Sequence, residues 1–72
     1  MSAALLEKAG TAMYGEGWKH KMAEDLGIGL RGLRRMATGE APIPETMWAE
    51  IGALLDARAH YIRAIFVEIE KL

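Results

Sequence analysis

The sequence predicts an all-α fold in one small domain. Apolar residues recur at intervals of three and four along most of the chain, which is the spacing of amphipathic helices. Glycines and prolines interrupt this pattern, so it divides into separate helices. The chain has 72 residues, and a core of that size buries only about 60% of the surface of the unfolded chain. Dimerisation is therefore a natural source of added stability.

Two short helices are expected first. The apolar face of the first helix is interrupted by Gly15 and Gly17. A second helix then carries Trp18, Met22 and Leu26 at four-residue spacing and ends at Gly27. We expect Trp18, Tyr14 and Trp48 to be core residues, since each flanks an apolar helical face. The apolar face of the first helix, which precedes Gly15, consists of Leu5, Leu6, Ala9 and Met13.

A third helix is expected to begin near Gly29 and to stop at Gly39, and its residues divide between two faces. The prolines at 42 and 44 then impose a short loop. The inward face holds Leu30, Leu33, Met36 and Ala37. The outward stripe, at positions i, i+3, i+4 and i+7, holds Arg31, Arg34, Arg35 and Thr38.

From Pro44 to Leu72 the pattern predicts one long helix, of up to about 28 residues and roughly 40 Å. Its apolar residues step by three and four, which is the spacing of a helix that pairs with another helix. The second half has nothing left in the chain to cover it, so we expect a homodimer. Arg58 interrupts this seam, and it either pairs across the dimer with a carboxylate such as Asp56 or Glu68 or faces solvent. The expected dimer interface is Tyr61, Ile62, Ile65, Phe66, Ile69 and Leu72.

Charge is distributed unevenly along the chain. The net charge of −1 argues against a strongly basic nucleic-acid binder, but residues 17–38 carry five basic and two acidic side chains, whereas residues 39–72 carry three basic and six acidic ones. The chain has no cysteine, and its two histidines are far apart in sequence, so neither a metal nor a cofactor is expected. Without a signal peptide or a membrane span, a cytoplasmic protein that does not contact the membrane is the default.

The segment 19–39 matches a helix-turn-helix, with Ala23 at the helix crossing, Gly27 in the turn and Leu33 as an apolar plug. The chain resembles the lambda-repressor-like, or XRE-type, helix-turn-helix regulators, in particular small versions from bacteria and phages. The likeness covers about residues 14–55. It departs from the family at Gly29, Leu30 and Gly32, where a polar or hydroxyl side chain is usual. The motifs that carry the likeness are Leu26-Gly27-Ile28, Arg34-Arg35 and Gly39-Glu40-Ala41-Pro42-Ile43-Pro44.

Together with the pattern along the chain, the resemblance leads us to expect a single helix-turn-helix domain spanning residues 1–72. The motif lies at 18–39, and the apolar spacing predicts a dimerisation helix at 44–72. Arginine can bind two acceptors of guanine or clamp a phosphate. If the third helix enters a major groove, Arg31 and Arg35 are the leading base contacts and Arg34 contacts a base or a phosphate. We expect the remaining DNA contacts from Lys19, Lys21 and Thr38 on the DNA backbone and from Gly29 and Leu30 at the start of the helix.

A dimer would bind double-stranded DNA at an inverted repeat, with its two recognition helices about 34 Å apart. With no effector domain in view, a small repressor or autoregulator is the expected function. One alternative is a protein-interaction module, such as an antirepressor or a phage-encoded inhibitor, which Leu30, Gly32 and the acidic second half favour. Another is an activator that touches RNA polymerase through Glu24 and Asp25. No nucleophile with a base and an orienting partner is present, so we do not expect an enzyme.

Overall fold

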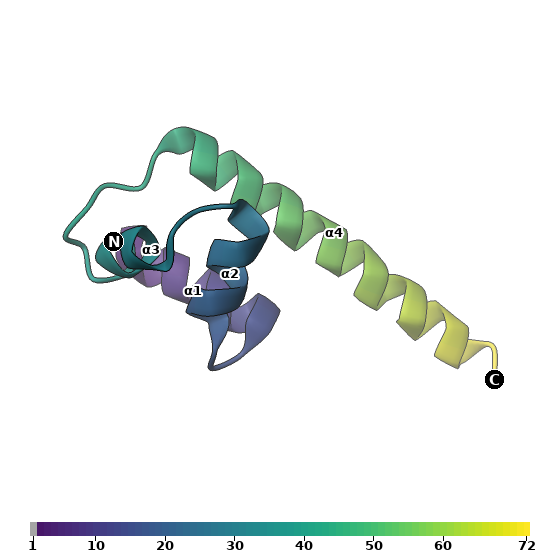
Figure 1. Ribbon diagram of the computed structural model, residues 1–72. Helices are drawn as coiled ribbons and strands as arrows, with labels where there is room; N and C mark the ends of the chain where they lie inside the picture. The colour runs from purple at the N-terminus through teal and green to yellow at the C-terminus, as the bar shows by residue number, and fades with distance from the viewer. Residues whose placement is uncertain (1) are drawn as a thin grey trace.

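The computed structural model describes residues 2–72, which form four α-helices and contain no strand. The prediction of an all-α fold is confirmed (Figure 1). The predicted end of the second helix at Gly27 and the start of the third beside Gly29 are also confirmed. The helices are α1 (Ser2–Tyr14), α2 (Trp18–Leu26), α3 (Leu30–Ala37) and α4 (Glu45–Glu70).

One small apolar core holds the helices together. Helix α1 contacts the other three helices, and α2 also contacts α3 and α4. Trp18 is buried, and Tyr14 and Trp48 are half-buried against the core, as predicted. Leu5, in contrast, is 55% exposed, because the face that α1 turns to the core is narrower than the sequence pattern suggested. The buried side chains are those of Leu6, Ala9, Trp18, Met22, Ala23, Leu33, Met47 and Ile51.

The close approach of α1 and α2 depends on Gly10. A Cβ atom added at Gly10 would overlap Cε3 and Cδ2 of the Trp18 ring. The indole therefore lies directly against the backbone of α1. A glycine inside a helix lowers stability by roughly 0.5–1 kcal/mol relative to alanine. At Gly10, the absence of a side chain makes room for Trp18, the largest side chain of the core.

The corner between α2 and α3 is built on Gly27. Its backbone has φ 68° and ψ 32°, the left-handed conformation that glycine adopts without steric cost. The N–H of Ile28 donates to the carbonyl of Ala23 at 3.0 Å, and the N–H of Gly27 donates to that of Glu24 at 3.2 Å. These bonds form a Schellman motif, which ends α2 and redirects the chain into α3.

Helix α4 extends far beyond the core. Its first turns carry Met47 and Ile51 into the core, whereas residues 59–72 are all exposed. We call α1, α2, α3 and the part of α4 up to Arg58 the head. The second half of α4 projects from the head as one continuous helix (Figure 1), which gives the molecule dimensions of 48 × 23 × 23 Å.

Arg58 marks the boundary between the covered and the uncovered halves of α4. Its guanidinium donates to the carbonyl oxygen of Met13 at 3.1 Å, lies 3.8 Å from Oδ2 of Asp25 and stacks 4.5 Å from the centre of the Tyr14 ring. The prediction that Arg58 pairs across a dimer or faces solvent is therefore corrected. Arg58 ties α4 to the ends of α1 and α2 in the same chain.

Tyr14 completes this cluster. Its hydroxyl donates to Oδ2 of Asp25 at 2.6 Å. Partial burial raises the pKa of Tyr14 above its ordinary value of 10.0, the hydrogen bond to Asp25 and its negative charge raise it further, and Arg58 partly opposes the shift. The folded chain therefore favours the neutral phenol.

Two glycine substitutions test the packing of the core. Gly10→Ala is expected to lower the free energy of unfolding by about 1–3 kcal/mol, because the new methyl group overlaps the Trp18 ring. Gly52→Ala is the matched control: Gly52 also lies inside a helix, but nothing lies within 4 Å of its added Cβ. This change is expected to raise stability by about 0.5–1 kcal/mol. Urea unfolding measures both, and equal effects would contradict the contact described here.

The raised pKa of Tyr14 predicts a specific loss of stability in alkali. The unfolded phenol loses its proton near pH 10.0, before the folded one does, so its contribution is complete below that pH and is lost as the pH rises through the folded pKa. Tyr14→Phe removes this dependence. Urea unfolding is expected to show that the free energy of unfolding falls more between about pH 9 and about pH 11 for the natural chain than for the variant. An equal drop would contradict the assignment.

Candidate nucleic-acid interface

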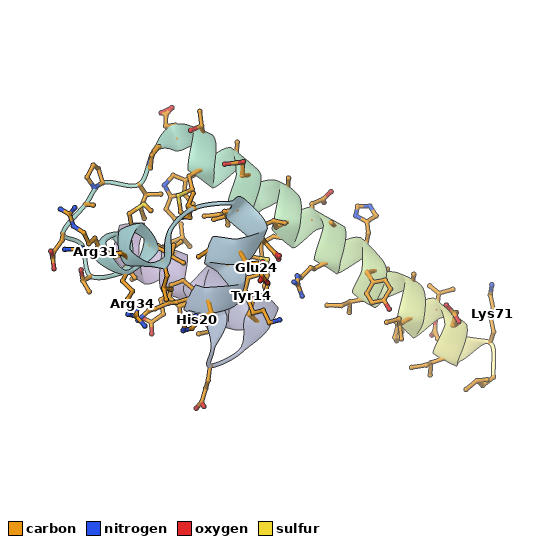
Figure 2. The ribbon with its side chains drawn as sticks, viewed as in Figure 1. Tyr14, His20, Glu24, Arg31, Arg34 and Lys71 are labelled. Carbon is orange, nitrogen blue, oxygen red and sulfur yellow. The ribbon has the colours of Figure 1, made fainter. Side chains whose placement is uncertain are left out.

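Helix α3 presents a basic outer face. Arg31, Arg34 and Arg35 are all exposed, whereas Leu33 on the opposite side is fully buried. Figure 2 shows that Arg31 and Arg34 project from α3 on the side of the molecule away from α4. Helix α3 contains no acidic residue. The predicted arginine stripe is therefore an outward surface of the head.

The arginines differ in their local partners. Within residues 2–72, Arg31 and Arg34 form no ion pair. Arg35 has its Nε atom 3.9 Å from Oε1 of Glu40, and both side chains are more than half exposed. Such a long, solvated pair contributes little to stability, so all three guanidinium groups remain available to an anionic partner.

The acidic residues of α2 lie away from this face. Asp25 is held by Tyr14 and Arg58 at the junction of α1, α2 and α4. Figure 2 shows Tyr14 and Glu24 on the side of α2 that faces α4, while Arg31 and Arg34 lie on the far side of the head. Within residues 2–72, no ion pair joins an acidic residue of α2 to an arginine of α3. This placement also leaves Asp25 less free to touch a polymerase than the sequence suggested.

The other side chains predicted at the interface differ in how exposed and how free they are. Lys21 is exposed, and Lys19 is half-buried with its Nζ atom 5.7 Å from the centre of the Trp18 ring. Thr38 is exposed, but its hydroxyl donates to the carbonyl of Arg35 at 3.0 Å. Lys21 is thus the freer of the two lysines, and the hydroxyl of Thr38 retains its acceptor capacity.

At the start of α3, the groups available to bind a partner are backbone amides rather than side chains. Gly29 is extended at the N-cap and provides no side-chain hydrogen bond, while Leu30 is half-buried against the core. The first N–H groups of a helix are free to bind an anion. Gly29 and Leu30 can therefore contribute amide hydrogens, whereas the side chain of Leu30 serves the core.

An open, mainly apolar cavity of about 350 Å³ lies beside the arginine stripe. Ile28, Gly32 and Met36 line it on the α3 side, and Pro42 and Met47 line it on the other. Arg35 also lines this cavity, so its side chain lies between the outer face of α3 and the groove. Sequence reasoning missed this groove and the pairing of Arg35 with Glu40. The position of Glu40 directly after the Gly39 turn was the available signal.

Comparisons with protein-family models, with curated proteins and with solved structures give no match to this chain. In the part of the chain that the structure describes, no helix combines the length and the apolar character needed to cross a membrane.

Proposed function

We propose that this chain is a sequence-specific DNA-binding transcriptional regulator of the lambda-repressor-like helix-turn-helix kind, acting as a dimer. The observation that carries the proposal is the outward stripe of Arg31, Arg34 and Arg35 on a short helix that begins directly after a left-handed glycine corner. An α-helix fits the major groove of DNA, and arginine is the side chain that most often reads guanine there.

In this proposal α2 and α3 form the helix-turn-helix, and α3 is the recognition helix. Three features support it: Ala23 is buried where the helices meet, Gly27 is left-handed in the turn, and Leu33 is fully buried beneath α3. With α3 in a major groove, its exposed face meets the bases. Arg31 and Arg35 then contact base edges, Arg34 contacts a base or a phosphate, and Lys21 reaches the DNA backbone.

The dimer is proposed from the uncovered half of α4. Ile65, Phe66 and Ile69 are between 41% and 59% exposed, on a face that the head does not cover. A second copy would bury them and add the apolar area that a core of eight side chains lacks. Two recognition helices would then bind an inverted repeat, and the dimer would repress by occupying a promoter.

A protein-interaction module remains the second candidate, because the apolar cavity beside α3 favours it. Ile28, Met36 and Met47 give this groove a surface that suits a peptide side chain better than a phosphate. In this reading the chain keeps its fold but binds a protein, as an antirepressor or an inhibitor does. Its affinity would depend on apolar contacts and only weakly on salt.

The DNA proposal predicts strong salt dependence. Binding to a labelled duplex, measured by fluorescence anisotropy, is expected to weaken steeply between about 50 and 200 mM salt, because released counterions supply much of the affinity. The duplexes are the region upstream of the chain's own gene and a random sequence. Tighter binding to the upstream region supports a specific regulator, whereas absent or salt-independent binding to both would favour the interaction module.

A pair of arginine substitutions tests the surface. If Arg34 contacts a phosphate, Arg34→Ala is expected to reduce by about one the slope of the logarithm of the binding constant against the logarithm of the salt concentration. If Arg34 contacts a base, the change is expected to weaken binding by about 1–3 kcal/mol at one base position. Arg63→Ala is the matched control, since Arg63 is an exposed arginine on the projecting half of α4 and lies over Phe66. Equal losses in the two variants would contradict the assignment of α3 as the reading helix.

The dimer proposal is tested on α4 itself. Ile65→Glu is expected to convert the dimer to a monomer in sedimentation equilibrium, because it places a charge in the apolar stripe. Val67→Glu is the matched control: its side chain has a similar exposure, 37% against 41%, but lies away from the stripe. Circular dichroism is expected to show a folded chain in both. An unchanged mass for Ile65→Glu would contradict the proposed interface.

A further inference from the structure

The apolar residues of α4 repeat on one face of the helix. At about 3.6 residues per turn, Ile51 and Ile69 lie five turns apart and so point in the same direction. The three other apolar residues that α4 turns to the head have apolar counterparts at the same spacing in sequence. The four pairs are Met47 and Ile65, Trp48 and Phe66, Ile51 and Ile69, and Leu54 and Leu72.

The two halves of this face have different surroundings. Met47 and Ile51 are buried in the head, and Trp48 and Leu54 are half-buried. Their counterparts from Ile65 to Leu72 are all exposed. Since α1 and α2 cover the first half of the face, the head lies on the same side of α4 as the stripe that its second half leaves uncovered.

We propose that two copies of the chain pair through residues 62–72, which are the end of α4 and the two residues after it, in an antiparallel arrangement with the heads at opposite ends. This inference rests on the dimer of the proposed function and is independent of DNA binding. Paired helices lie about 8–10 Å apart, whereas the body of the molecule is 23 Å across. In a parallel pair both heads would have to occupy the narrow space between the two α4 helices. In an antiparallel pair each head lies beyond the end of the other helix.

Charge also favours a second copy as the occupant. The stripe itself is uncharged, so it is complementary to itself. The rest of this segment carries two basic residues, Arg63 and Lys71, and two acidic residues, Glu68 and Glu70. Helices that lie on a membrane surface are rich in basic residues on their polar face, which this balanced segment is not.

The helix termini add to the preference for the antiparallel pair. Each α-helix has a partial negative charge at its C-terminal end. Antiparallel pairing brings that end of one α4 toward Arg58 of the other copy, where the side chain is 43% exposed. A parallel pair would instead place the two negative ends side by side.

Distances between spin labels test the arrangement. The chain has no cysteine, so single labels can be placed at Ala49→Cys, near the start of α4, and at Lys71→Cys, near its end; both positions are exposed. At 1.5 Å per residue, the antiparallel pair places the two labels at position 49 about 45–55 Å apart, while those at position 71 lie within about 30 Å. A parallel pair whose α4 helices stay about 8–10 Å apart along their whole length gives short distances at both positions.

Pulsed electron spin resonance on the full chain without DNA distinguishes these outcomes. A long distance at position 49 with a short one at 71 supports the antiparallel pair. Short distances at both positions overturn it and leave the dimer intact, and no distance at either overturns the dimer as well. Circular dichroism of each variant checks that it is folded. DNA binding is measured separately by anisotropy, so its failure does not affect this result.

Discussion

The organisation of this molecule depends on a single constraint: the apolar face of α4 is longer than the head that covers it. Met47 and Ile51 lie in the core, and the same face continues to Ile65 and Ile69, which no part of the described chain covers. Burying apolar surface stabilises by about 25 cal/mol per Å², so an exposed stripe leaves part of the available stabilisation unused. A core of eight buried side chains gains proportionally more from a second copy than a large domain would.

Arg58 determines where the head ends. A leucine at this position would have continued the stripe without interruption, whereas the guanidinium instead binds the carbonyl of Met13 and the carboxylate of Asp25. Because these groups are partly exposed, the cluster contributes modestly to stability. It also holds the carboxylate of Asp25 against Tyr14 and Arg58, at the junction of α1, α2 and α4. The same contact therefore ties α4 to α1 and α2 and engages an acidic side chain of α2 within the chain.

The sequence predicted the helices well because their boundaries have local causes. Gly27 ends α2 through a left-handed turn, and the prolines at 42 and 44 separate α3 from α4. Contacts between residues distant in sequence were not predictable. The partners of Arg58 lie on α1 and α2, and the exposure of Leu5 follows from the narrow face that α1 turns to the core. The arginine stripe was predictable as an outward surface, because the face of a helix follows from residue spacing alone. The groove beside Arg35 was not predictable, because it depends on how the loop before α4 packs.

The position of helix α3 is determined by the head and not by the projecting half of α4. With eight residues, an internal Gly32 and no side-chain cap, α3 has weak local reasons to be helical. It is held by burial of Leu33 against α1 and α2, and it makes no close backbone contact with α4. The orientation of the arginines is therefore set within the head, by the core and the Gly27 corner. In the proposed dimer, the distance between the two heads is set separately, by the pairing of α4. A change in the projecting half of α4 would then alter the spacing of the two arginine faces without altering either face.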